Sequence, residues 1–234
     1  MNKTRIQIIS ASIVLLVAAA TIPGIRTLFM DNQSYPFITA RGEVVYLFGS
    51  GVYRHMGEVM ANMGAAQDVI TLFVAGPLML IGALSYDASN RKKMVFFTGV
   101  TAYITLTYTL YLFMATYNRL FIVYVLLAGI SLNLLIYLLK RLKTLADSMT
   151  SFNEKEATSG GLSAMGIASV MGLLWLSLIA PSIINEGTIP KPLDHYTTLV
   201  VQGADLAFFL PWVFLGGYHA FKKRPRGVIY MNTI

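Results

Sequence analysis

The residues best placed to do chemistry in this sequence are acids inside long apolar segments. Asp205 lies in an otherwise uncharged run that ends at the basic residue Lys222. If the run is helical, the separation of 17 residues places Asp205 about 25 Å from Lys222 along the helix axis. An ionised group deep in a bilayer costs about 2.5 to 3.5 kcal/mol on the insertion scale, so it should face protein or a water-filled cavity. Asp205 therefore indicates a binding site, or a structural acid that bonds a Ser, Thr or Tyr of a neighbouring helix.

A second acid, Asp68, follows Gln67 at the start of another apolar run, where the positive end of a helix dipole favours it. Gln202 and Asp205 sit near the corresponding end of a later run, and the segments PLMLIGA and PWVFLGG follow the two acids. Each proline removes an intrahelical hydrogen bond, and paired interrupted helices can indicate a binding site. The likeness is short and the Asp-to-Pro spacing differs, nine residues against six, so it is weak support for a repeat.

The predicted ligand site combines these two spans with the external loop between the first and second spans. Its carboxylates could hold a cation or an amine, or relay protons. The predicted ligand-binding residues are Tyr53, Arg54, Glu58, Gln67, Asp68, Gln202 and Asp205.

Other kinds of site lack a motif. The chain has no cysteine, which excludes thiolate catalysis and thiolate metal ligands. His55 and His195 could approach the two acids, but no metal-binding spacing accompanies them, and Gly49-Ser50-Gly51 is no nucleotide fingerprint. We therefore predict no metal, no cofactor and no catalytic residue.

The elements that must position these residues are membrane spans. Hydrophobic residues make up 56% of the 234 residues and charged residues only 12%, which is too few charges for a soluble domain. Uncharged runs long enough to cross a bilayer occur six times and predict one all-α transmembrane domain over residues 1–234. The predicted spans cover 6–25, 68–86, 94–117, 120–139, 162–184 and 197–221.

Basic residues set the predicted orientation. With the N-terminus inside, 13 Lys and Arg fall on the cytoplasmic side and 5 on the other, so both termini are predicted to be cytoplasmic. This placement explains the net charge of +7 without a nucleic-acid partner. We predict a multi-pass protein of the cell membrane, which in a bacterium is the inner membrane. Its predicted partner is the lipid bilayer, and the sequence does not indicate its oligomeric state.

The connections differ in character. Residues 26–67 form an external loop longer than a connector needs and rich in apolar side chains, which predicts a cap over the bundle. Residues 140–161 are polar and predict a cytoplasmic linker. The third span contains a stripe of threonines: Thr98, Thr101, Thr105 and Thr109. We favour a role in helix packing for this stripe over a role in substrate binding.

The segments GVYRHMGEVMANMGAAQDVITLFVAGPLML, ATYNRLFIVYV and VVQGADLAFFLPWVFLGGY resemble a group of uncharacterised bacterial integral membrane proteins. The resemblance covers residues 51–226 and implies no assigned activity. It implies that Tyr53, Arg54, Gln67 and Asp68 belong together. It also implies a further span after the basic segment, where this chain has only RPRGVIYMNTI.

Three functions follow as hypotheses. The preferred one is binding or transport of a small molecule or cation at an outer-leaflet site on the second and sixth spans. The second is an intramembrane enzyme that uses Asp68 and Asp205 as acid and base on a lipid-like substrate. The third is a non-catalytic membrane partner whose polar residues only pack helices.

Overall fold

The structure, a computed structural model, describes residues 1–31, 33–148, 152–185, 187–225 and 227. Six helices in these residues are long and apolar enough to cross a membrane, which confirms the predicted all-α, six-span class. The chain divides into two compact units, residues 1–137 and 138–234, and each is described by itself. We keep the words outer and inner for the orientation that the basic residues predict.

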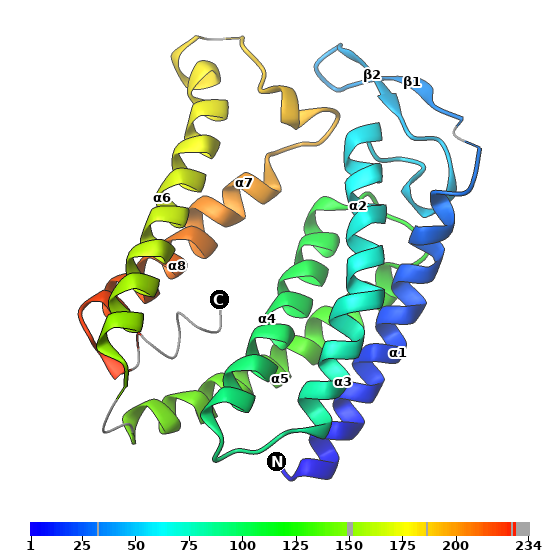
Figure 1. Cartoon of the computed structure of the whole chain (residues 1–234). Helices are drawn as coiled ribbons and strands as arrows, with labels where there is room; N and C mark the ends of the chain where they lie inside the picture. The colour runs from blue at the N-terminus through cyan, green and yellow to red at the C-terminus, as the bar shows by residue number, and fades with distance from the viewer. Residues whose placement is uncertain (32, 149–151, 186, 226, 228–234) are drawn as a thin grey trace. The chain divides into compact units, whose positions relative to one another are not determined.

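The first unit is built around α1 (Lys3–Thr27), which packs against both halves of a broken second span. That span comprises α2 (Glu58–Ile70), a π-helical turn η2 (Thr71–Ala75) and α3 (Gly76–Leu84). α4 (Arg91–Met114) packs against α3 and η2, and α5 (Phe121–Asp147) follows it and continues into the second unit. Figure 1 shows α1 alongside α2 and α3 over most of their length.

The external loop between α1 and α2 is an ordered cap. It contains the antiparallel strands β1 (Tyr35–Ile38) and β2 (Val44–Leu47), followed by the short 3-10 helix η1 (Gly51–Tyr53). The predicted loop of 26–67 is too long, because residues 58–67 belong to α2. Glu58 and the polar residues after it had excluded this stretch from an apolar run, although its composition suits a helix.

The second unit consists of α6 (Glu154–Ile184) and a second broken span. This span comprises α7 (Val200–Ala204), the π-helical turn η4 (Asp205–Phe209) and α8 (Leu210–Phe221). A Cβ on Gly161 would lie 2.5 Å from the Gly217 carbonyl oxygen, so α6 and α8 touch backbone to backbone. The predicted linker 140–161 is largely helical, because α5 extends to Asp147 and α6 begins at Glu154.

Threonine hydroxyls of α4 bond backbone carbonyls of their own helix. Each of the hydroxyls of Thr98, Thr101, Thr105 and Thr109 donates to the carbonyl four residues earlier, at 2.7 to 2.8 Å. Thr98 and Thr101 are fully buried, and Thr101 also lies 3.8 Å from the Met79 sulfur of α3. A packing role, which we favoured for this stripe, agrees with these contacts.

Candidate functional site

The first unit encloses a single buried carboxylate, Asp68, whose side chain is 1% exposed. Two tyrosine hydroxyls bond its two oxygens: Tyr53 of the cap donates to Oδ2 at 2.5 Å, and Tyr111 of α4 lies 3.1 Å from Oδ1. Among the described residues, no lysine, arginine or histidine forms an ion pair with it. Asp68 is therefore held only by neutral partners, an arrangement that leaves a negative charge uncompensated in a low-dielectric surrounding.

Tyr111 has more acceptors than hydrogens. Its hydroxyl lies 2.9 Å from the Gly64 carbonyl oxygen as well as 3.1 Å from Asp68, and the Tyr53 hydroxyl lies 3.2 Å away. A tyrosine supplies one hydrogen, so Tyr111 cannot donate to both acceptors at full strength. Four close contacts of the Asp68 and Tyr111 oxygens, including the one between Tyr53 and Tyr111, thus share two hydrogens when Asp68 is ionised.

Two glycines make room for this arrangement. A Cβ on Gly24 of α1 would lie 1.7 Å from Asp68 Oδ2 and 2.9 Å from the Tyr53 hydroxyl oxygen. A Cβ on Gly64 of α2 would lie 3.3 Å from the Tyr53 ring. The carboxylate therefore rests directly on the backbone of α1, next to Pro23, whose missing N–H leaves the Ala19 carbonyl without its helical partner.

Tyr53 is fixed by the cap and cannot ionise near neutral pH. Its side chain is 1% exposed, and burial raises the pKa of its hydroxyl well above the usual range, an effect that Tyr111 and Asp68 reinforce. The cap holds this ring because η1 packs on the outer end of α1, where a Cβ on Gly51 would lie 2.4 Å from Thr27 Oγ1. Tyr53 therefore acts as a permanent hydrogen-bond donor to Asp68.

Gln67 begins a second set of hydrogen bonds on the same two helices. Its Nε2 donates to the Tyr103 hydroxyl at 2.6 Å and lies 3.4 Å from Thr107 Oγ1. Thr71, the first residue of η2, donates to the Gln67 carbonyl at 2.8 Å and lies 3.0 Å from Tyr103. Tyr103, Thr107 and Tyr111 recur every four residues along α4, so one face of this helix bonds the polar edge of α2.

Further tyrosines close the site on the side of α5. The Tyr111 ring lies 5.7 Å from Tyr108 and 5.2 Å from Tyr124, measured between centroids. Tyr108 is 1% exposed, and its hydroxyl has no hydrogen-bond partner among the described residues. The Asp68 cluster, defined here as Tyr53, Gly64, Asp68 and Tyr111, thus lies in an aromatic surrounding in which Tyr53 and Asp68 are buried.

The predicted site residues separate into groups. Of the four residues that the resemblance groups, Tyr53 bonds Asp68 and Gln67 adjoins it on α2, whereas Arg54 does not join them. The side chains of Arg54 and Glu58 are exposed. Arg54 lines a different hollow of the cap together with Asp31 and Ser50.

Gln202 and Asp205 belong to the second unit. Gln202 is buried, and Asp205 Oδ2 accepts a hydrogen bond of 2.9 Å from the indole N–H of Trp175 on α6. The structural alternative for Asp205 named Ser, Thr or Tyr as its partner, whereas the partner is a tryptophan. A site shared by Asp68 and Asp205 stays a prediction.

His55 and His195 each contact a residue of their own loop. His55 Nδ1 lies 3.1 Å from the Tyr35 hydroxyl, and His195 Nδ1 lies 3.3 Å from Asp194 Oδ1. In the described part of the chain, no three His, Cys, Asp or Glu side chains are grouped so that they could hold a metal ion.

Sequence reasoning missed several residues of this cluster. Tyr111, Gly24, Gly64 and Tyr103 were not predicted as site residues. The spacing of Tyr103, Thr107 and Tyr111 was a signal, because i, i+4, i+8 places them on one helix face. Gly24 carries no such signal, since only the fold shows what lies against it.

Comparison with known proteins adds no family. No protein-family model matches the chain, and neither a curated protein nor a solved structure matches it. The resemblance to uncharacterised bacterial membrane proteins stays an expectation, and the argument for function depends on the Asp68 cluster.

Proposed function

We propose that this protein is a transport-type membrane protein whose Asp68 cluster binds a proton or, in its place, a small cation. The observation that carries the proposal is the hydrogen count around Asp68. With Asp68 ionised, Tyr53 and Tyr111 supply two hydrogens for the contacts to Asp68 Oδ2, Asp68 Oδ1 and the Gly64 carbonyl. With a proton on Oδ1, Asp68 would donate to Tyr111, which would then donate to Gly64, so that each of these three contacts has a hydrogen.

The burial of Asp68 also favours a bound proton or cation. A buried carboxylate is stable in hydrocarbon surroundings only when it is neutralised or paired, and here the bonded partners are neutral hydroxyls. A proton neutralises it directly. A small cation could instead take the Asp68, Tyr111 and Gly64 oxygens as ligands, since hard cations prefer oxygen donors.

The helix that carries Asp68 has a backbone interruption close to the site. The π-helical turn η2 begins three residues after Asp68, and Pro77 follows it in α3. Single π-helical turns are often found at functional sites, and interrupted spans form ion sites in several transporter folds. A turn of this kind lets the outer half of the span, which carries Asp68, move relative to the inner half.

The other two hypotheses have less support. An enzyme that used Asp68 as an acid or base would need one of its oxygens free to meet a substrate, whereas tyrosine hydroxyls bond both. A purely structural role predicts the same contacts but no bound proton that can be exchanged. The experiment below is chosen to separate binding from structure.

Infrared difference spectroscopy of the purified protein in liposomes tests the proposal. A neutral Asp68 should give a carboxylic acid band that disappears when the pH is raised or when Na⁺ or K⁺ is added at fixed pH. We expect the band to be missing in Asp68→Asn and unchanged in Asp87→Asn. Asp87 is a matched control because it is an acid of the loop between α3 and α4 that bonds only local groups, among them Ser89.

The same liposomes with an entrapped pH dye report movement of protons. A pH gradient or a Na⁺ gradient should change the internal pH in the wild type and in Asp87→Asn, and not in Asp68→Asn. Loss of thermal stability alone in Asp68→Asn, with the band and the fluxes equal to those of the wild type, would show that Asp68 is only structural. A band that responds to pH and not to Na⁺ or K⁺ identifies the proton as the ligand.

A further inference from the structure

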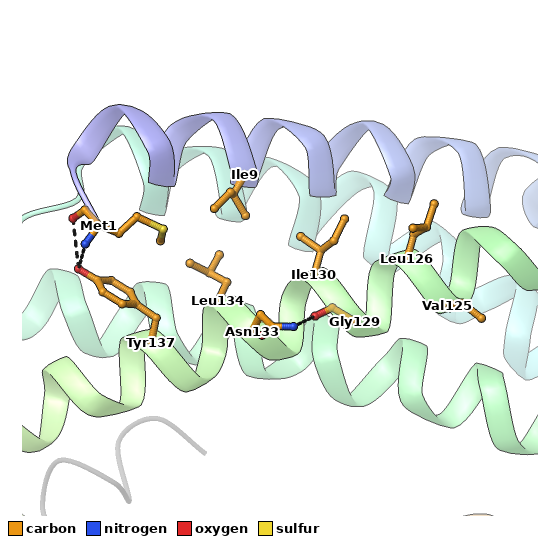
Figure 2. A pocket seen from close by; sticks show the side chains of 9 residues that line it. All are labelled: Met1, Ile9, Val125, Leu126, Gly129, Ile130, Asn133, Leu134 and Tyr137. Atoms are coloured by element: carbon orange, nitrogen blue, oxygen red, sulfur yellow. Dashed lines mark hydrogen bonds between the residues drawn. The ribbon is translucent and has the colours of Figure 1, made fainter.

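A shallow apolar groove runs between α1 and α5 in the first unit. Its volume is about 350 Å³, and its lining is almost wholly apolar. Figure 2 shows Ile9 of α1 pointing toward Ile130 and Leu134 of α5 across the groove. A groove of this size accepts a few side chains rather than a whole helix.

One polar side chain, Asn133, interrupts this surface. It lies seven residues before Lys140, about 10 Å above the predicted inner boundary, and therefore within the hydrocarbon layer. Its side chain is exposed and its Nδ2 donates to the Gly129 carbonyl at 2.8 Å. Within the described residues of the first unit nothing donates to its Oδ1, and its second amide hydrogen has no acceptor. An exposed carboxamide at this depth is stabilised by a partner in another helix.

The backbone beside Asn133 is open to close approach. Gly129 lies one turn earlier on α5, and a Cβ built on it would meet no atom within 4 Å. Small residues at such positions let two membrane helices come together until polar side chains can bond across the contact. The pair of Gly129 and Asn133 thus offers both the space and the hydrogen bonds that helix association uses.

We propose that this face of α5 is the contact between two copies of this chain, with Asn133 of one copy bonded to the partner's Asn133. A lipid acyl chain could fill the groove but would leave the Asn133 amide without a hydrogen bond. A second copy satisfies it, because a carboxamide is both donor and acceptor and two of them can exchange hydrogen bonds. Two copies inserted in the same direction also place Asn133 at equal depth, as a two-fold axis along the membrane normal requires.

Cysteine cross-linking in liposomes tests the contact directly, since the chain has no cysteine of its own. Gly129→Cys keeps Asn133 intact and should form a covalent dimer on oxidation, because a disulfide needs Cα atoms within about 7 Å. Gly166→Cys on α6 is the matched control, as this glycine is also exposed and a Cβ on it would meet no atom within 4 Å.

The affinity of the pair should depend on the amide. Fluorescence energy transfer between labelled copies at increasing dilution in lipid should give a dissociation constant about threefold to tenfold higher for Asn133→Leu than for the wild type. Asn133→Gln, which keeps a carboxamide, should restore part of the difference.

Three results would overturn the proposal. The first is a covalent dimer of Gly129→Cys no more abundant than that of Gly166→Cys. The second is equal affinity of the wild type and Asn133→Leu. The third is a monomeric wild type that copurifies with a lipid which Gly129→Leu removes, and this result would make the groove a lipid site instead.

Discussion

In the broken span of the first unit, a five-residue π-helical turn begins at Thr71, six residues before Pro77. In the broken span of the second unit, a turn of the same length begins at Asp205, six residues before Pro211. Both prolines take the second position of the helix that follows. The backbone interruption therefore recurs at the same position of both spans, which strengthens the short sequence likeness between PLMLIGA and PWVFLGG.

The side chains at the two breaks do not correspond. Counted back from the prolines, Asp205 corresponds to Thr71, and Gln202 corresponds to Asp68. The buried acid of the first unit lies one turn before its π-helical turn, where two tyrosines enclose it, whereas Asp205 opens its turn and bonds one tryptophan. Similar backbones thus carry different chemistry, and among the described residues only the first unit has a fully buried carboxylate bonded by neutral donors.

The largest expected effect comes from the glycine on which Asp68 rests. Gly24→Ala would place a methyl group 1.7 Å from Asp68 Oδ2, so the carboxylate must leave Tyr53 or α1 must move away. Overpacking of this kind costs about 3 kcal/mol of unfolding free energy. Gly203→Ala, at an open position of α7, should cost little and serves as the control. Unfolding by SDS in mixed micelles measures both, and equal values would show that the backbone contact at Gly24 is unimportant.

The two acids should differ when each is removed. Asp68→Ala removes the carboxylate acceptor of the buried Tyr53 hydroxyl and one of the two acceptors of Tyr111, a loss of about 2 kcal/mol. Asp205→Ala leaves one indole N–H without its partner in a half-buried setting, so about 1 kcal/mol is expected. The same SDS titration compares them. A greater loss for Asp205 would reverse the comparison and make the second unit the one that depends more on its acid.

Much of this fold could be predicted from the sequence, because a membrane span must be a long run without charges. The same physics hides which side of a span faces protein, since lipid and a protein interior are about equally apolar. The periodicity of apolar residues therefore does not indicate which face of each helix packs against protein. The contact of Gly24 with Asp68 had no sequence signal. Residues 58–67 were assigned to the loop because polar side chains end an apolar run without ending a helix.

The site was predictable where residues are close along the chain. Tyr53, Gln67 and Asp68 were grouped by resemblance and lie together, whereas Tyr111 enters from α4, more than 40 residues later, at a register set only by packing. Arg54 was grouped with them by the same resemblance, yet it lines another hollow of the cap. A π-helical turn has no sequence signal that sets it apart from a proline kink.

The smallest effect should be a pH dependence carried by the cap. Because burial raises the pKa of Tyr53 in the folded protein, its hydroxyl stabilises the fold at any pH below about 10, the value for an exposed tyrosine. Above about pH 10 the unfolded chain loses this proton and the folded chain does not, so stability falls as the pH rises.

Tyr53→Phe should cost about 1 kcal/mol at neutral pH, because a hydrogen bond to Asp68 is lost. Its stability should then decline less steeply than that of the wild type above about pH 10, because the residue can no longer ionise in the unfolded chain. Tyr46→Phe, at an exposed position of β2 in the same cap, should leave the wild-type slope unchanged. Thermal unfolding in detergent across this alkaline range measures the slopes. Equal slopes for Tyr46→Phe and Tyr53→Phe would show that the Tyr53 hydroxyl is not shielded from solvent. The buried acid of the first unit and the half-buried acid of the second would then differ less in their surroundings.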